Sequence, residues 1–304
     1  MIVYLGPEGT FAHSAVQQLA PADAAVQPAA SVIAALDQVR AGAATAAVVP
    51  IENSVEGSVS GTLDELSAEP ALRITAEAAV PVRFTLMAAA DLALNDITAV
   101  GTHPHAAAQC RRWLHENLPQ AVVVTTGSTA GAAEELAAGT AQFDAAIGNA
   151  LAARHFGLAP LVSDIADNRE AVTRFVQVER PGRLPGPTGA DKTSLLLFMR
   201  ANRSGALLEI LTEIAVRGIN MTRLESRPTR HALGDYCFSA DIEGHVAEAR
   251  VGEALMGLRR ACADVVFLGS YPRLDGRTPD LPTGVSDFDY AAADEWLAAI
   301  RSGR

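Results

Sequence analysis

The sequence predicts an α/β protein in which a large first region is followed by a smaller domain. From residue 1 to about residue 180, short apolar runs alternate with Ala-rich helical stretches. The runs are nearly continuous in apolar residues, which is typical of a sheet covered by helices on both faces. A Pro/Gly-rich segment at 181–192 then precedes the order strand, helix, strand, strand, helix, strand at 193–272. Ligands of α/β sheets bind beyond the carboxyl ends of strands, so we expect functional residues in the turns that follow them.

The composition excludes several classes of protein. The chain of 304 residues is 49% hydrophobic and 19% charged, which excludes a disordered chain. The net charge of −11, without any Lys/Arg cluster, argues against non-specific nucleic-acid binding. Three cysteines without a CxxC spacing suggest neither a disulfide framework nor a zinc site. No secretory signal or membrane span is evident, so we expect a cytoplasmic protein.

Seven strands and five helices are expected in the first region. The strands are expected at 2–5, 46–50, 97–102, 121–126, 144–149 and from 175 onward, with further β structure within 72–89. The helices are expected after Thr10, over 31–42, over 63–67, over 105–117 and after Ser128. Hydroxyl side chains at Thr10, Ser31, Thr62 and Ser128 precede these helices and predict N-caps.

The second region has a different rhythm. Strands are expected at 193–200, 219–229, 234–244 and 264–272, with a turn at 231–234, and helices at 205–218 and 246–262. This βαββαβ order is that of the ferredoxin-like fold. A tail at 273–304 contains a short helix at 290–301, whose apolar side chains on one side predict a packing element.

Two turns in the first region follow strands and contain polar or glycine residues. "GPEGTF" at 6–11 has glycines that allow close backbone approach and a threonine that can cap the next helix. It lacks the GxGxxG spacing, which disfavours a nucleotide, and an ordinary strand-to-helix turn remains an alternative. "PIENSVEGS" at 50–58 places Glu52, Asn53, Ser54, Glu56 and Ser58 within seven residues, more donors and acceptors than a simple turn requires.

Two further segments attract attention. "GTHPHAAAQC" at 101–110 contains His103 and His105, but no third ligand lies at helical spacing, so metal binding is disfavoured. Gln109 lies one helical turn beyond His105 and could reach the same crevice. In "EAVTRFVQV" at 170–178, Thr173 and Arg174 precede an apolar strand. Taken alone, they read as a strand-forming residue and a solvated edge residue.

Together these four segments resemble the prephenate dehydratase family, whose motifs are a GPxGTF turn, a PIENS segment, an HPQ…QC segment and a TRF strand. "SGAL" at 204–207 and "LESRP" at 224–228 resemble the effector motifs of the ACT domain found in that family. The resemblance runs from about residue 2 to residue 272, in the family's order. It indicates a monofunctional member, because the helical chorismate mutase domain of bifunctional relatives is not seen.

The resemblance implies a two-lobed catalytic region at 1–180, similar to type 2 periplasmic binding proteins. One lobe would comprise about 1–80 with 166–180, and the other about 81–165. An ACT domain would follow the linker, at 193–272. The implied reaction converts prephenate to phenylpyruvate, water and carbon dioxide in phenylalanine biosynthesis. It needs no cofactor, because aromatisation of the ring supplies the driving force.

The resemblance also implies roles for individual residues. Thr173 would assist the departing hydroxyl, and Arg174 would face a substrate carboxylate or orient Thr173. Adjacent side chains of a strand point to opposite faces, which weighs against both reaching the ligand. Substrate-binding roles would fall to Thr10, Asn53, Ser54, Gln109 and Phe175. The chain departs from the family at Ala171 and Val172, where an Asn is usual before the TRF threonine, and at His105, where Gln is common.

Regulation and assembly are implied in the same way. Phenylalanine would bind across a dimer of ACT domains, and the dimers would pair to a tetramer. The implied effector-binding residues are Gly205, Ala206, Leu207, Glu225 and Ser226. Two alternatives stay open at this point: a preference for arogenate, the amino analogue of prephenate, and a non-catalytic sensor of small anions or amino acids.

Overall fold

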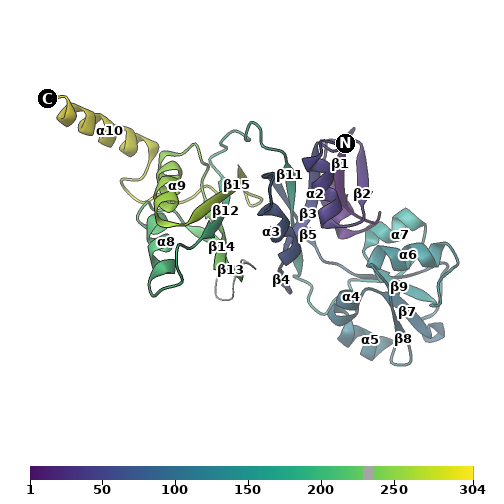
Figure 1. Ribbon diagram of the computed structural model, residues 1–304. Helices are drawn as coiled ribbons and strands as arrows, with labels where there is room; N and C mark the ends of the chain where they lie inside the picture. Colours follow the sequence, from purple (N-terminus) through teal and green to yellow (C-terminus); the bar gives the residue numbers. More distant parts are fainter. Residues whose placement is uncertain (229–235, 304) are drawn as a thin grey trace. The chain divides into compact units, whose positions relative to one another are not determined.

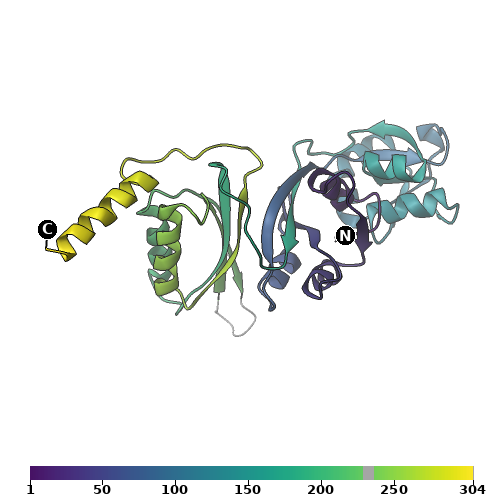
Figure 2. The same cartoon turned by 90° about the horizontal axis from the view of Figure 1, so that it is seen from above.

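The computed structural model describes residues 1–228 and 236–303 (Figures 1 and 2). The chain forms two compact units, Met1–Glu65 with Ala78–Val178 and Leu66–Glu77 with Glu179–Arg304. No helix in the described part of the chain is long and apolar enough to cross a membrane. The turn expected at 231–234 lies outside the described residues. We describe each unit by itself.

The first unit contains most of a sheet in the order β2-β1-β3-β11-β5, with a short β4 paired to β3. Its strands are β1 (Ile2–Leu5), β2 (Val26–Ala29), β3 (Ala46–Asn53), β4 (Gly57–Ser58), β5 (Arg73–Pro81) and β11 (Val172–Glu179). The helices that accompany it are α1 (Phe11–Leu19), α2 (Val32–Arg40) and α3 (Ser60–Leu66). Strand β1 is parallel to both β2 and β3, so the turns after β1 and β3 open at the same edge. We call this sheet and its helices the first lobe.

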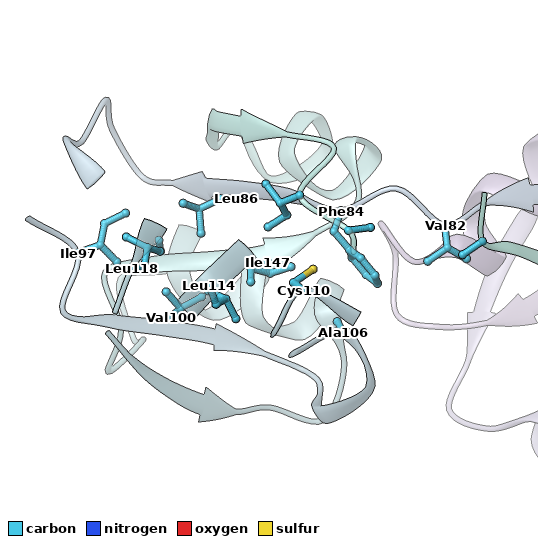
Figure 3. Close-up of a cluster of buried hydrophobic side chains, with 14 residues drawn as sticks. Val82, Phe84, Leu86, Ile97, Val100, Ala106, Cys110, Leu114, Leu118 and Ile147 are labelled. Carbon is cyan, nitrogen blue, oxygen red and sulfur yellow. The ribbon is translucent and has the colours of Figure 1, made fainter. Parts of the chain in front are cut away.

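The same unit contains a second sheet in the order β10-β6-β9-β7-β8. Its strands are β6 (Thr85–Ala88), β7 (Ala99–Thr102), β8 (Val122–Thr125), β9 (Ala145–Gly148) and β10 (Ala159–Ser163). Its helices are the 3₁₀ turn η1 (Leu94–Asp96) and the α-helices α4 (Pro104–Gln109), α5 (Arg111–Asn117), α6 (Thr129–Ala137) and α7 (Ala150–Phe156). Figure 3 shows its apolar core, in which Leu86, Val100 and Ile147 of the strands lie in one cluster with Leu114 and Cys110. We call this sheet and its helices the second lobe.

The single helix expected at 105–117 is wrong, because the chain leaves helical geometry at Cys110 (φ −114°, ψ 13°). Helix α4 ends there, and the Cys110 side chain is buried in the core. A new helix then begins because Asp167, far away in the sequence, accepts hydrogen bonds from the amides of Arg112 (3.0 Å) and Trp113 (3.3 Å). The sequence pattern predicts one helix here, but the carboxylate of the distant Asp167 caps a second one.

The cap expected at Thr62 is also wrong. Helix α3 begins at Ser60, and the buried Thr62 hydroxyl donates to the carbonyl of Pro50 at 2.6 Å. The caps expected at Thr10, Ser31 and Ser128 are confirmed, since each side-chain oxygen accepts the amide three residues ahead. Strands β2 and β10 and helix α7 were not predicted. Each is short, and the burial of β2 and β10 is irregular.

The second unit has the predicted βαββαβ order. Its elements are β12 (Asp191–Phe198), α8 (Ala206–Ala215), β13 (Met221–Pro228), β14 (Tyr236–Glu243), α9 (Ala249–Ala261) and β15 (Asp264–Pro272). The four strands form an antiparallel sheet in the order β13-β14-β12-β15, and α8 and α9 cover one face (Figure 2). Apolar residues from all these layers, among them Leu195, Ile210, Phe238 and Val251, form one core.

Strand β12 begins at Asp191, inside the segment 181–192 that we expected to be linker. The Asp191 carboxylate accepts the amides of Thr188 (2.7 Å) and Gly189 (3.0 Å), which closes a turn just before the strand. Lys192 then forms an ion pair with the buried Glu77 at 3.0 Å. These two partners order the end of the linker, and a composition rich in Pro and Gly does not reveal them.

The expectation that the C-terminal helix packs along its apolar side is wrong within this chain. Helix α10 (Asp287–Arg301) is attached at its base, where Asp287 accepts the amide of Ala249 at 2.8 Å. Beyond that point it extends away from the sheet (Figure 1), and Trp296 and Ile300 remain 65% and 50% exposed. The amphipathic pattern predicted the helix correctly, but no part of the chain that the structure describes covers its apolar stripe.

Candidate active site

A cavity of about 630 Å³ lies in the first unit, lined by residues of both lobes. Five of the seven residues that we expected at the catalytic site line it, namely Thr10, Asn53, Gln109, Thr173 and Phe175. They come from segments up to 165 residues apart, since the first is residue 10 and the last residue 175. Ser54 and Arg174 are not among the lining residues. The fold therefore joins most of the motifs at one place.

Thr173 is the second residue of β11 and is 8% exposed, with its side chain at the cavity wall. Its hydroxyl oxygen accepts a hydrogen bond from Asn53 Nδ2 at 2.9 Å. The orientation of that amide is fixed, because Asn53 Oδ1 accepts the backbone amides of Val55 (2.8 Å) and Glu56 (3.1 Å). No acceptor for the Thr173 hydroxyl hydrogen is found among the described residues. The hydroxyl can therefore donate into the cavity.

Ser54 fixes the backbone at the start of β11, the strand that contains Thr173. Its hydroxyl accepts the amide of Val172 at 2.9 Å, and its own amide donates to the carbonyl of Val172 at 2.9 Å. These two bonds join the turn after β3 to the residue just before Thr173. Ser54 thus acts on backbone position rather than at the cavity surface.

Arg174 lies on the side of β11 opposite to Thr173, as strand alternation requires. Its guanidinium is 3.5 Å from the carboxylate of Glu52, and its side chain is 12% exposed. Glu52 and Asn53 are adjacent on β3, so the pair Glu52–Arg174 lies behind the pair Asn53–Thr173. Two neighbouring strands are therefore joined side chain to side chain on both faces.

The turn after β1 forms another part of the wall. The Thr10 hydroxyl donates to the carbonyls of Leu5 (3.1 Å) and Pro7 (3.0 Å) and accepts the amide of His13 (3.3 Å). Its hydrogen is thereby used within the turn. Gly6 is required because a Cβ there would lie 2.7 Å from Cβ of Pro28. What this turn offers the cavity is chiefly the N-terminus of α1.

Two kinds of lining residue were missed by sequence reasoning. The first is the start of α6, where Gly127, Ser128 and Thr129 line the cavity and Ser128 caps the helix by accepting the amide of Gly131 at 2.8 Å. A capping serine directly after a strand was the available signal. The second kind is aromatic: Phe11 and Phe84 meet edge to face at 5.6 Å and line the cavity beside Phe175.

Four side chains meet at the mouth of the cavity. Glu56, in the turn after β3, lies 3.0 Å from Nδ1 of His105 and accepts a hydrogen bond from Gln109 Nε2 at 3.2 Å. His103 stands edge to face with His105 at 4.9 Å. Burial lowers the pKa of His103, with the charge of His105 adding to this and that of Glu56 opposing it. Glu56 belongs to the first lobe, and the other three residues belong to the second.

The charges around the cavity limit how a ligand is held. Among the described lining residues there is no lysine or arginine, whereas Glu56 and Glu135 are present. Within the described part of the chain, no group of three or more His, Cys, Asp and Glu side chains could hold a metal ion. Helix N-termini carry free amides and the positive end of the helix dipole, so α1 and α6 are the available sites for anionic groups.

A second cavity, of about 610 Å³, lies in the second unit. It is lined at the start of α8 by Ser204, Gly205, Ala206 and Leu207, and on β13 by Ser226. Gly205 has φ +84°, a left-handed conformation that favours glycine and opens the helix N-terminus. Apolar groups of Met199, Leu211 and Phe238 complete the wall.

Glu225, which we expected among the effector-binding residues, is not part of this wall. Its carboxylate lies 3.5 Å from the guanidinium groups of both Arg223 and Arg227 on the same strand. Four of the five expected residues therefore line the cavity, namely Gly205, Ala206, Leu207 and Ser226.

Comparison with known proteins now identifies the family. The family model described as prephenate dehydratase matches residues 2–183. The curated prephenate dehydratase of Amycolatopsis methanolica is 47% identical over 303 residues, covering 99% of this chain and 98% of that protein. The chain belongs to the prephenate dehydratase family. The predicted family, its α/β fold and its class, a carbon–oxygen lyase, are thereby confirmed.

Two solved structures extend this comparison. The crystal structure of the prephenate dehydratase of Arthrobacter aurescens in complex with L-Phe is 46% identical, with a TM-score of 0.93 and 99% of both chains covered. A structure described as GqqA, a novel type of quorum quenching acylase, is 31% identical, with a TM-score of 0.79, covering 91% of this chain and 99% of that one. A fold shared with a protein of a different described activity means that the reaction must be argued from the site itself.

Proposed function

We propose that the chain converts prephenate to phenylpyruvate in the cavity of the first unit, with Thr173 assisting the departing hydroxyl. The observation that supports this most is the Asn53–Thr173 hydrogen bond. Because Asn53 donates to the threonine oxygen, the threonine hydrogen is directed elsewhere, and the cavity is the open direction. The donated bond also increases the polarity of the threonine O–H, which makes it a better donor.

The substrate is a dianion, and the cavity offers it amides rather than side-chain cations. One carboxylate would be held at the N-terminus of α6, by the amides near Ser128 and Thr129, and the other near the start of α1. The ring would lie against Phe11, Phe84 and Phe175. The amides are held by the helices before the substrate arrives, so little reorganisation is needed during the reaction.

The chemistry requires only positioning and one proton. The bond between the ring and its carboxylate breaks to release carbon dioxide, and the electron pair moves into the ring. As the ring double bonds shift, the carbon–oxygen bond on the opposite ring carbon breaks, the oxygen leaves with the bonding pair of that bond, and a proton from solvent completes a water molecule. Thr173 donates its hydrogen bond to this oxygen as negative charge develops on it. A free alcohol is a weak acid, so Thr173 serves as donor or relay rather than as the final proton source.

Ser54 and Arg174 serve as positioning residues in this proposal. Ser54 fixes the backbone of Val172, and Arg174 ties β11 to β3 through Glu52. Neither needs to contact the substrate. Gln109 and Thr10 belong to the cavity wall, where Gln109 approaches from the second lobe.

The experiment that tests the proposal is a direct assay of turnover. The purified full-length chain would be incubated separately with prephenate and with arogenate, and formation of phenylpyruvate and of phenylalanine would be followed. We expect turnover of prephenate and its loss in Thr173→Ala. Turnover of arogenate alone would replace the substrate, and no turnover of either would favour the sensor alternative.

We further propose that phenylalanine binds the cavity of the second unit and inhibits the reaction. The start of α8 offers amides to the amino acid's carboxylate, and Leu211 and Phe238 offer an apolar wall to its ring. The related Arthrobacter aurescens protein, 46% identical, was crystallised in complex with L-Phe. The proposal takes 1–180 as catalytic domain, 193–272 as ACT domain and 273–304 as tail.

The same cavity supports a proposal about assembly. Leu208 and Tyr236, at its rim, are 66% and 41% exposed. A second copy of the chain placed there would cover both and close the effector site, and pairing of such dimers would give a tetramer. Sedimentation with and without phenylalanine tests this.

A cytoplasmic location is also proposed, because all three cysteines are free and buried.

A further inference from the structure

Two glutamate–histidine pairs bridge the lobes of the catalytic unit. Glu56, in the turn after β3 of the first lobe, lies 3.0 Å from His105 of α4 in the second lobe. Glu8, in the turn after β1 of the first lobe, lies 2.7 Å from Nε2 of His155 of α7 in the second lobe. Both glutamates therefore come from turns that border the cavity, and both histidines come from helices of the opposite lobe.

A second histidine, called the inner one here, lies beside the bridging, or outer, histidine of each pair. His103 stands edge to face with His105 at 4.9 Å, and His13 stands edge to face with His155 at 6.1 Å. Burial lowers the pKa of both inner rings, with the neighbouring histidine adding to the effect and the glutamate opposing it. His13 is also stacked on Tyr4 at 5.0 Å. The inner rings therefore stay neutral at neutral pH.

The two outer histidines are more accessible. The side chain of His105 is 66% exposed and that of His155 is 34% exposed. An imidazole that gains a proton carries a positive charge, and its hydrogen bond to a carboxylate is then charge-assisted. The groups that face them are also charged or titratable. Glu56 and His103 lie beside His105, and Glu135 lines the same cavity, whereas Glu8 and His13 lie beside His155.

Other contacts between the lobes do not depend on pH. Phe11 of α1 packs on Phe84, and Gly9 lies against α7, where an added Cβ would be 3.1 Å from Cα of Ala152. Gln109 donates to Glu56 at 3.2 Å through an amide, a group that does not titrate. Apolar packing and an amide hydrogen bond therefore join the lobes. The two Glu–His bridges add an attraction whose strength depends on whether the histidine is protonated.

We propose that the Glu8–His155 and Glu56–His105 pairs hold the lobes closed over the substrate and make substrate affinity depend on pH. This inference rests on the proposed function. When the outer histidines are protonated, each pair is a charge-assisted bridge, and closure is favoured. As pH rises the charge is lost, the bridges weaken and KM increases. The residues act by positioning the lobes, so kcat should change much less than KM.

The test measures KM and kcat for prephenate between pH 6.0 and 8.5 at constant ionic strength, with uncatalysed reaction subtracted. We expect KM of the unaltered chain to rise with pH, with each exposed pair contributing about two- to fivefold. His105→Gln and His155→Gln should each remove part of the rise, and the double variant should remove it. Glu56→Gln should remove the same part as His105→Gln, because it keeps an amide partner for Gln109 but loses the charge.

His115→Gln is the matched control. His115 lies on α5 in the second lobe and is exposed, but it is not part of either bridge. Its variant should keep the full dependence of KM on pH. The proposal is overturned if the double variant retains the rise in KM, if the rise resides in kcat, or if His115→Gln abolishes it equally.

A second measurement does not depend on turnover. Spin labels at Ile33→Cys of α2 and Val122→Cys of β8, which are 52% and 66% exposed, report the distance between the lobes. We expect longer distances at pH 8.5 than at pH 6.0 in the unaltered background, and no such change in the His105→Gln/His155→Gln background. An unchanged distance would contradict the bridges, whereas absence of prephenate turnover with a pH-dependent distance would contradict only the proposed substrate.

Discussion

The two cavities of the molecule have similar volumes but are built differently. The cavity proposed for catalysis, of about 630 Å³, is lined by residues of both lobes of one unit, and its central threonine is buried and hydrogen-bonded. The cavity of the second unit, of about 610 Å³, consists of a helix start and an apolar wall with an exposed rim at Leu208 and Tyr236. Catalysis requires donors fixed before the substrate binds. A regulatory site can be left open for another chain to complete, since that couples binding to assembly.

The largest effect that sharpens this comparison is expected at Thr173. Thr173→Ala should lower kcat/KM for prephenate by about 10²- to 10⁴-fold, because the donor to the departing oxygen is lost. Thr173→Ser keeps the hydroxyl and should stay within about tenfold of the unaltered chain. Steady-state kinetics of the two variants measure this. Equal rates for both would remove the hydroxyl from the mechanism.

A smaller but still large effect is expected at Asn53. Asn53→Asp replaces the amide donor by a carboxylate, so the Thr173 hydroxyl would donate to residue 53 instead of the substrate. The added charge would also repel a dianion. We expect a loss of about 10²-fold in kcat/KM with little change in melting temperature. Asp64→Asn is the control. It exchanges a carboxylate and an amide on α3, at a residue that does not line the cavity.

The regulatory cavity should respond more weakly to change. Gly205→Ala forces a side chain into a left-handed conformation at φ +84°, which costs about 1–2 kcal/mol. The helix start should then shift, and the phenylalanine concentration for half inhibition should rise by roughly tenfold. Titration calorimetry with phenylalanine, together with inhibition assays, measures the change. Full inhibition at the original concentration would exclude the start of α8 as the effector site.

The smallest effect is expected at the rim. Leu208→Glu places a charge where a second copy of the chain is proposed to pack, and phenylalanine binding should weaken by about threefold. Val216→Glu is the matched control, because Val216 ends the same helix with 67% exposure but does not line the cavity. If both variants behave alike, or sedimentation shows no assembly, the effector cavity is not shared between chains.

Much of the fold could be predicted from the sequence, because it depends on interactions between residues that are close along the chain. The caps at Thr10, Ser31 and Ser128 are decided by hydrogen bonds that span three residues, and these were predicted correctly. The apolar runs likewise predicted the βαββαβ order of the second unit. The break at Cys110 and the cap formed by Asp167 on α5 were missed because they depend on residues more than fifty positions apart.

The candidate site, too, could be predicted only in part from the sequence. The motifs gave the types of residue that the cavity needs, and strand alternation already weighed against Arg174 reaching the ligand beside Thr173. The bond from Asn53 to Thr173 spans 120 positions, and the ion pair of Arg174 with Glu52 runs between neighbouring strands. Neither leaves a periodic signal in the chain.

The sequence by itself determined most of the strands and helices, the caps at Thr10, Ser31 and Ser128, and the family that the chain resembles, because those features depend on neighbours along the chain. Only the tertiary structure decided which hydroxyl faces the cavity, which arginine turns away, and which glutamates of the first lobe meet histidines of the second. These are matters of strand order and lobe placement. They arise when distant segments are buried together, and burial is a property of the whole fold.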